Sequence, residues 1–130
     1  MSNKSTGASF EREVQNILNK RGVCVRVGGS GTGKINVCDL VYIRGAKVFL
    51  IECKTAFSDK FYPYEREILQ FEELKKAAKI SGARAILLIK FKKKKGRPKK
   101  IVFIDLEEYN FKPVNYEDYK DSLSYLKDKF

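Results

Sequence analysis

The sequence predicts one α/β domain whose central mixed β-sheet is flanked by helices on both faces. Three observations predict this fold class. Segments of helical and strand-like periodicity follow one another in the order α-β-β-β-α-β-β-α. The run VYIRGAKVFLI, residues 41–51, is apolar at nearly every position outside its turn, which is typical of strands in the middle of a sheet. The chain has 130 residues, enough for one hydrophobic core and too few for two.

One helix and three strands are expected in the first half of the chain. Apolar residues recur at helical spacing from Phe10 to Leu18, which predicts a helix over residues 9–21 that ends at Gly22. We expect a type II′ hairpin turn at Gly45 and Ala46, because its first position requires positive φ and is here a glycine. The three expected strands cover residues 23–27, 37–43 and 47–54.

The second half is expected to add two helices and two strands. Residues 57–63 are interpreted as a connector, residues 64–81 as a helix that ends at Gly82, and residues 116–126 as a weakly amphipathic last helix. Strands are expected at residues 84–91 and 101–106. The tail aromatics are more typical of core packing than of an interface; they are Tyr109, Phe111, Tyr116, Tyr119 and Tyr125.

The charge of the chain favours a polyanionic partner. Lys and Arg number 27 against 16 Asp and Glu, a formal net charge of +11. Residues 1–104 carry 23 basic and 9 acidic side chains, whereas residues 105–130, an acidic and partly helical tail, carry 4 and 7. We therefore expect nucleic acid as the partner, ahead of an anionic membrane surface.

A polybasic hairpin is predicted at residues 90–100, where eight of eleven residues are basic. A solvated, disordered loop is the alternative, but on so basic a body we favour binding to DNA phosphates. The residues expected to bind them are Lys92, Lys93, Lys94, Lys95, Arg97, Lys99 and Lys100.

Several functional classes are not expected. No run of about 18 apolar residues is present to span a membrane, and the N-terminus lacks the apolar core of a signal peptide, so a cytoplasmic protein is expected. Cys24, Cys38 and Cys53 lie in apolar runs of a chain without histidine, and we interpret them as core residues rather than zinc ligands or disulfides.

Residues 28–34, GGSGTGK, match most of a phosphate-binding P-loop. The position that needs a hydroxyl for Mg²⁺ is Ile35, and a strand follows where that motif needs a helix, so no nucleotide cofactor is expected. The segment is either a plain connecting loop or one that approaches a DNA backbone through Ser30, Thr32 and Lys34.

The expected hairpin brings acidic and basic side chains together. Counting outward from the turn places Asp39 opposite Glu52, and alternation places Glu52 and Lys54 on one face. Two opposed carboxylates repel, so either a hard cation such as Mg²⁺ or a buried salt bridge to Lys54 must compensate them. Both interpretations remain open, and a register slip of one residue would move Asp39 to the other face.

Asp39 and the Glu52-Cys-Lys54 tripeptide, preceded by Glu11 in a helix, resemble the PD-(D/E)xK motif of nucleases with the restriction-endonuclease-like fold. Within that group, the chain is most similar to archaeal-type Holliday-junction resolvases. The similarity covers residues 4–91 and includes residues 7–12 (GASFER), Arg26 with the loop that holds Ser30, and the helix from Gln70 to Ala77. Cys38 stands where the motif name has proline, and the polybasic hairpin and acidic tail have no clear counterpart.

The resemblance implies a metal-dependent, structure-selective endonuclease that resolves four-way DNA junctions as a homodimer. It implies Mg²⁺, with Mn²⁺ as a substitute, bound directly or through water by Glu11, Asp39 and Glu52. It also implies that Lys54 activates the attacking water, that Ser30 lies near the scissile phosphate, and that Gln70 supports the site. Arg12 and Arg26 are added to the residues expected to bind DNA. From the residues alone, Glu13 could take the place of Glu11.

Two alternative functions are considered. One is another nuclease of this fold that acts on flaps or duplex DNA, and the other is a non-catalytic nucleic-acid-binding protein.

Overall fold

The computed structural model describes residues 3–27, 37–122 and 130. Within these ranges, no helix is long and apolar enough to cross a membrane. The elements are α1 (Asn3–Leu18), β1 (Val23–Arg26), β2 (Leu40–Arg44), β3 (Lys47–Ala56), β4 (Lys60–Phe61), α2 (Glu65–Ser81), β5 (Arg84–Phe91), β6 (Lys100–Asp105), β7 (Val114–Asn115) and a 3₁₀ turn (Tyr116–Asp118).

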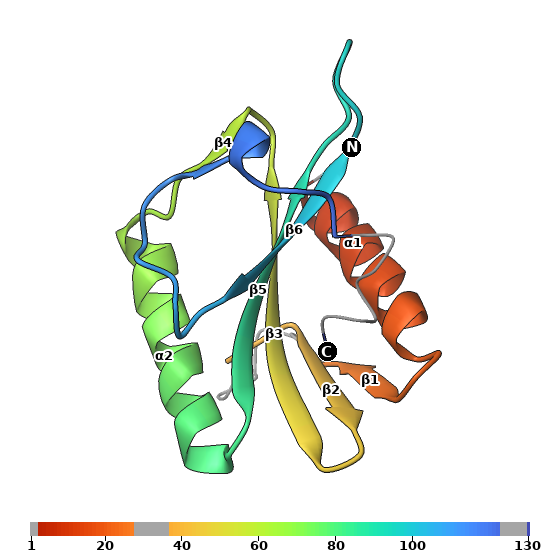
Figure 1. The fold of residues 1–130 in the computed structure, drawn as a ribbon, viewed down its shortest axis with the longest axis vertical. Helices are drawn as coiled ribbons and strands as arrows, with labels where there is room; N and C mark the ends of the chain where they lie inside the picture. The colour runs from red at the N-terminus through yellow and green to blue at the C-terminus, as the bar shows by residue number, and fades with distance from the viewer. Residues whose placement is uncertain (1–2, 28–36, 123–129) are drawn as a thin grey trace.

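The predicted mixed sheet is confirmed. Five strands lie in the order β1-β2-β3-β5-β6, and β3 and β5 run parallel because α2 crosses over between them. The other neighbouring pairs are antiparallel, and β4 and β7 form a separate two-stranded sheet. Figure 1 shows α1 and α2 on opposite sides of the central sheet.

The turn between β2 and β3 fixes the register of the hairpin as predicted. Gly45 has a φ of 60°, and Ala46 does not share this positive φ, which matches a type II′ turn. Arg44 pairs with Lys47, and the ladder continues in step to Leu40 opposite Ile51. The turn chemistry at one glycine therefore determines which residues meet at the far end of the hairpin.

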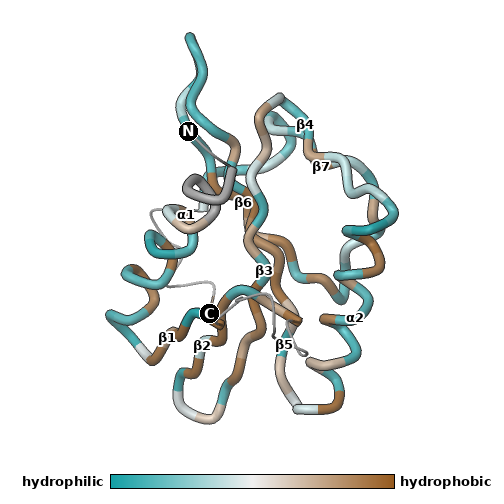
Figure 2. The backbone as a smooth tube through the Cα atoms, turned by 180° about the vertical axis from the view of Figure 1, so that it is seen from behind, coloured by the Kyte–Doolittle hydropathy of each residue, from teal (hydrophilic) through white to brown (hydrophobic). Residues whose placement is uncertain are grey.

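The core has two layers, one on each face of the sheet. Strand β5 is buried on both faces, so Leu87 and Ile89 pack toward α2 while Ile86 and Leu88 pack toward α1. Figure 2 shows hydrophobic colour along β3 and β5, and hydrophilic colour at the tip of the hairpin that joins β5 to β6. The helices contribute Phe10, Val14 and Leu18 from α1, and Phe71, Leu74 and Ala78 from α2.

Cys24 and Cys38 are core residues, as predicted, with 2% and 3% of their surface exposed. Burial raises the pKa of each thiol to about 11. Cys53 is partly buried and packs against the α1-side layer, where burial also raises the pKa of its thiol. Thiols with such pKa values are protonated at neutral pH and are poor nucleophiles.

The tail differs from the predicted helix over residues 116–126. Helical turns stop at Asp118, residues 119–122 are not helical, and residues 123–129 lie outside the described part of the chain. The reason is that the tail pairs with the edge strand β6: the Asp121 carboxylate accepts the Ile101 N–H at 2.9 Å, and Ser122 N–H donates to the Ile101 carbonyl at 2.7 Å. Phe130 then packs in the α1-side core, in edge-to-face contacts with Tyr42, Phe49 and Phe103.

Candidate active site

Asp39 is fixed at the point where β2 begins. The ladder with β3 ends at Leu40 and Ile51, so the next backbone groups of β3 need other partners. Asp39 N–H donates to the Ile51 carbonyl at 3.0 Å, and the Asp39 carboxylate accepts the Cys53 N–H at 2.8 Å. The Asp39 side chain thereby replaces a missing strand residue and is held against the segment that carries Glu52.

Glu52 is a buried carboxylate with incomplete charge compensation. Only 3% of its surface is exposed, and Lys54 Nζ lies 3.4 Å from its Oε2. Burial, followed by the negative charge of Asp39, raises the pKa of Glu52 to about 8, although Lys54 acts in the opposite direction. The salt bridge considered as an alternative is therefore present, but it does not balance both carboxylates.

The Asp39 and Glu52 pair fits a hard divalent cation. Mg²⁺ is commonly held by one or two carboxylates and fills its other positions with water and substrate phosphate oxygens. Among the described residues, no three carboxylates, thiols or imidazoles are arranged to hold a metal ion together. Glu11, Asp39 and Glu52 are therefore not assembled as a set of three ligands. The fold brings two of them, Asp39 and Glu52, together.

Glu11, rather than Glu13, lies toward Asp39. Burial, and then the charge of Asp39, raises the pKa of Glu11, whose Oε1 is 3.2 Å from Arg26 Nε. Glu13 points elsewhere and binds Lys90 at 3.4 Å and Lys99 at 2.7 Å. Burial acts to raise the pKa of Glu13, but these two lysines outweigh it and lower that pKa overall. Glu11 thus lies at the edge of the site, where it is paired with Arg26.

The other residues expected in the site are less closely placed. Gln70 is half-buried on α2, which covers the sheet face that Glu52 and Lys54 share, but among the described residues it makes no hydrogen bond with Asp39, Glu52 or Lys54. Arg12 is exposed on α1. Ser30, Thr32 and Lys34 lie outside the described part of the chain.

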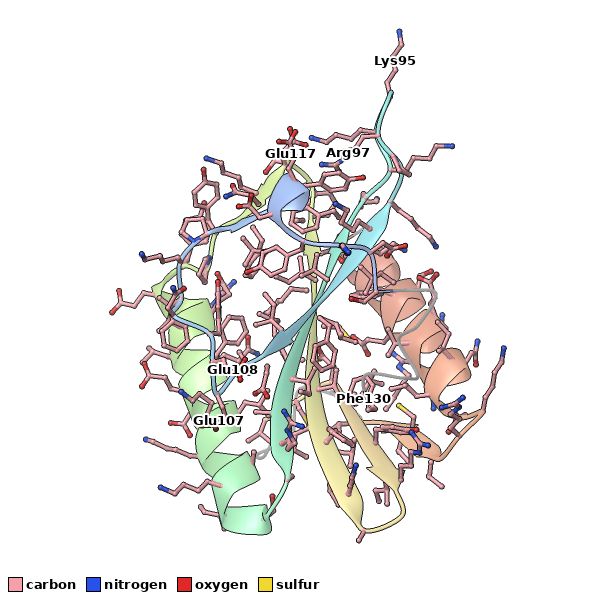
Figure 3. All side chains as sticks on the ribbon, in the orientation of Figure 1. Lys95, Arg97, Glu107, Glu108, Glu117 and Phe130 are labelled. Carbon is pink, nitrogen blue, oxygen red and sulfur yellow. The ribbon has the colours of Figure 1, made fainter. Side chains whose placement is uncertain are left out.

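The polybasic segment forms the tip of the β5–β6 hairpin, as predicted. Lys94 and Arg97 exchange backbone hydrogen bonds of 2.9 Å around Gly96, whose φ is 77°. Lys93, Lys94 and Lys95 are exposed, and Figure 3 shows Lys95 projecting beyond the body of the protein. Three adjacent cations therefore lie exposed at the tip of this hairpin.

Three other basic residues of this hairpin that were expected to bind DNA have partners within the protein. Arg97 is bound to the Asp59 carboxylate and the Lys92 carbonyl, and its guanidinium lies 4.4 Å from the centre of the Tyr116 ring. Lys100 Nζ donates to the carbonyls of Tyr116 at 2.6 Å and Tyr119 at 2.7 Å. Lys99 is paired with Glu13. The Arg97 side chain is only 12% exposed, and a cation that loses water on burial needs such partners, whereas Lys99 keeps 42% of its side chain exposed.

Residues 2–119 match the family model described as archaeal Holliday junction resolvase (Hjc). The chain belongs to this family. It is 36% identical over 85 residues to the crossover junction endodeoxyribonuclease Hjc of Methanocaldococcus jannaschii, covering 65% of this chain and 59% of that protein. It is 30% identical over 91 residues to the crossover junction endodeoxyribonuclease Hje of Sulfolobus acidocaldarius, covering 69% of this chain and 65% of that protein. The alignments thus span under two thirds of both curated relatives.

The fold of this Hjc-family chain is also that of a solved resolvase. The structure of Archaeoglobus fulgidus Hjc, described as a Holliday junction resolvase from an archaeal hyperthermophile, matches with a TM-score of 0.67. The match covers 91% of this chain and 98% of the other, at 24% sequence identity. It supports the restriction-endonuclease-like arrangement of the sheet and helices.

Sequence reasoning missed one feature beside Lys54. A groove of about 450 Å³ is lined by Lys54 together with Phe57, Phe61, Tyr62 and Tyr64. These four aromatic residues fall within eight positions, FSDKFYPY, a density well above the chain average of 12% aromatic. That local enrichment is the signal that could have marked the connector between β3 and α2 as the lining of a groove.

Proposed function

We propose that this chain is a metal-dependent DNA endonuclease that cuts four-way junctions by phosphodiester hydrolysis. The observation that carries the proposal is the buried pair Asp39 and Glu52 with Lys54 beside it. Membership of the archaeal Holliday junction resolvase family and the names of both relatives support the same reaction and the same substrate.

In this proposal, Asp39 and Glu52 hold Mg²⁺, with Mn²⁺ as a substitute, and Glu11 acts through water from its pair with Arg26. The bound ion would supply Lewis-acid stabilisation of the charge that develops on the phosphate. Lys54, with 24% of its side chain exposed, hydrogen-bonds the attacking water and a phosphate oxygen. Water loses a proton to solvent and adds to phosphorus as the bond to the 3′ oxygen breaks. The leaving oxygen takes up a proton from solvent, which leaves a 5′-phosphate and a 3′-hydroxyl.

We further infer that the enzyme acts as a C₂ homodimer, because a four-way junction has two-fold symmetry and requires two strand cuts. The surface that supports this inference is the face of β1 and β2 opposite α1. Val23, Val25 and Ile43 lie there with 57%, 51% and 43% of their surfaces exposed, and Val23 pairs with Ile43 across the strands. Exposed apolar patches of this kind commonly mark protein interfaces.

The experiment that tests the function compares cleavage of a synthetic four-way junction, a flap and a linear duplex in Mg²⁺ and in Ca²⁺. Wild type should cut the junction preferentially in Mg²⁺, and Glu52→Gln should bind the junction without cutting it. Equal cutting of all three substrates would assign another nuclease activity. Lost stability in Glu52→Gln, with no wild-type cleavage to lose, would make the cluster structural and the protein a nucleic-acid-binding module.

A further inference from the structure

The groove beside Lys54 runs along the end of β3 toward the start of α2. It is lined by Lys54, Phe57, Lys60, Tyr62 and Tyr64, among others, and its volume of about 450 Å³ is in the range typical of small-ligand pockets, about 300–1,000 Å³. Figure 1 shows that β4, the end of β3 and the β5–β6 hairpin occupy the same end of the molecule. The groove therefore adjoins Lys54 and lies at the same end of the molecule as the hairpin that carries the exposed lysines.

Three aromatic side chains of this groove are presented to solvent. Phe57, Tyr62 and Tyr64 have 54%, 48% and 71% of their surfaces exposed. Among the described residues, the aromatic ring pairs involve other residues, such as Phe91 with Tyr116 and Phe71 with Tyr109, and not these three. The rings of Tyr62 and Tyr64 present their faces to solvent, whereas Lys92 Nζ lies over one face of the Phe57 ring.

The backbone that carries these rings is anchored at several points. Ser58 Oγ donates to the Lys60 carbonyl at 2.9 Å, and the Asp59 carbonyl accepts the Tyr116 N–H at 2.8 Å. Tyr64 N–H donates to Glu67 Oε1 at 3.1 Å at the start of α2. The rings are thus mounted on a fixed framework, which reduces the conformational entropy lost on binding.

The charges around the groove suit a phosphate chain. Lys54 and Lys60 line it, and Lys92 Nζ lies 5.3 Å from the centre of the Phe57 ring. Glu67 is the acidic residue of the lining, and its carboxylate is occupied by the Tyr64 N–H. Aromatic faces interleaved with cations are the features by which proteins bind single-stranded nucleic acid through base stacking.

We propose that this groove binds an unstacked nucleobase of the DNA strand whose phosphate lies at Lys54, with the base stacked on Tyr64 or Phe57. This inference rests on the proposed function and explains how the site would prefer a branched substrate. A base at a branch point unstacks at lower cost than one inside a continuous duplex, where both neighbours must be lost. Stacking on an aromatic side chain returns about 1–3 kcal/mol per base, so only the branched substrate gains from it.

The test measures binding in Ca²⁺ for wild type, Tyr64→Phe and Tyr64→Leu. The ligands are a four-way junction, the same junction with an abasic site at each branch-point nucleotide in turn, and a linear duplex. Tyr64→Leu should weaken junction binding about 5- to 150-fold, the equivalent of removing one base–aromatic stack, whereas Tyr64→Phe keeps wild-type affinity. One abasic position should abolish the difference between Tyr64→Leu and wild type, and duplex binding should be the same for all three proteins.

Ile80→Leu is the matched control, because Ile80 is an apolar side chain of α2 with 88% of its surface exposed and is not part of the groove lining. It should leave junction affinity unchanged. If Tyr64→Leu does not fold, Phe57→Leu against Phe57→Tyr supplies the same comparison.

The inference is overturned if Tyr64→Leu and Phe57→Leu both bind the junction as well as their aromatic counterparts, Tyr64→Phe and Phe57→Tyr. It is also overturned if every abasic junction shows the same loss as the intact one. It is also overturned if sedimentation shows that Tyr64→Leu separates two copies of the chain, because the ring then packs against protein. Failure of the proposed function looks different: wild type itself would neither prefer nor cut the junction.

Discussion

The carboxylate of Asp39 accepts a hydrogen bond from the backbone N–H of Cys53 at 2.8 Å, across the end of the β2–β3 ladder. This contact gives Asp39 two roles. It satisfies a backbone donor that β2 is too short to reach, and it holds a negative charge next to the buried Glu52. The structural role needs an oxygen acceptor, whereas the proposed catalytic role needs a charge.

Two substitutions of Asp39 separate these roles. Asp39→Asn keeps a side-chain oxygen for Cys53 N–H, so the free energy of unfolding should change little while Mg²⁺-dependent cleavage is abolished. Asp39→Ala also removes the acceptor, and an unsatisfied donor at this site should cost about 1–3 kcal/mol. Urea unfolding and junction cleavage measured on the same preparations check both effects. Full cleavage by Asp39→Asn would contradict a metal-binding role for this residue.

The position of Asp39 was predictable because local rules determine it. A glycine at the first turn position requires type II′ geometry, that geometry fixes the register, and strand alternation then places Glu52 and Lys54 on one face. The end of α2 was predictable for a similar reason: Gly82, at φ 69°, ends it in the left-handed conformation. The helix predicted over residues 9–21 instead spans Asn3–Leu18, so the stop predicted at Gly22 was wrong. Each of these features depends on residues close together in the sequence.

Features that depend on distant partners were not predictable in this way. Composition marked Arg97 as a DNA-binding residue, but its side chain is committed to Asp59 and Tyr116, which are 38 and 19 positions away. The tail followed a weak helical pattern, yet its backbone binds the edge strand at Ile101. The helical pattern alone also left Glu11 and Glu13 equivalent, and only the family resemblance chose Glu11. In the structure, Lys90 and Lys99 from the β5–β6 hairpin bind Glu13.

The buried Glu52 should make stability depend on pH in the metal-free protein. Its pKa rises from 4.5 to about 8 on folding, so between these values the folded state holds a proton that the unfolded state has released. Stability from this group is complete below about pH 4.5 and declines as pH rises toward 8. At about 1.4 kcal/mol per pKa unit, the decline is on the order of several kcal/mol.

Glu52→Gln provides the reference for this measurement, because glutamine does not titrate in this range. The free energy of unfolding of wild type minus that of Glu52→Gln, followed from acidic to alkaline pH in EDTA, should fall steadily. Added Mg²⁺ should reverse the fall at alkaline pH by binding the ionised pair. A difference that is flat with pH would show that folding does not raise the pKa of Glu52.

Arg97 should contribute to stability rather than to DNA affinity. Its side chain is only 12% exposed and joins the hairpin to Asp59 and to the rings of Tyr116 and Phe91. Arg97→Ala should lower the free energy of unfolding by about 2–4 kcal/mol, because it removes charged hydrogen bonds and cation–π interactions. Lys95→Ala, at the exposed tip of the same hairpin, is the control and should change it by under about 0.5 kcal/mol. Equal effects of the two substitutions would argue against this assignment.

The three exposed lysines at the tip should instead set the salt dependence of DNA binding. Replacing Lys93, Lys94 and Lys95 by alanine should reduce the slope of log K against log salt by about 0.9 for each phosphate that the protein no longer neutralises. The reduction should be the same for a junction and a linear duplex, since binding to phosphates carries no information about branching. Lys79→Ala on the last turn of α2 is the control, and an unchanged slope in the triple variant would place the DNA elsewhere.

The exposed face of β1 and β2 should hold the two copies of the proposed dimer together. Val25→Lys combined with Ile43→Lys places two charges on a surface that is 51% and 43% exposed in the single chain, so folding should be retained. Sedimentation velocity should show a dimer for wild type and a monomer for the double variant, because burying two unpaired ammonium groups at an interface is strongly unfavourable. The monomer should nick junctions without making paired cuts. Ile80→Lys is the control and should remain dimeric, because Ile80 lies on α2 with 88% of its surface exposed. A double variant that is still dimeric would assign the interface to another surface.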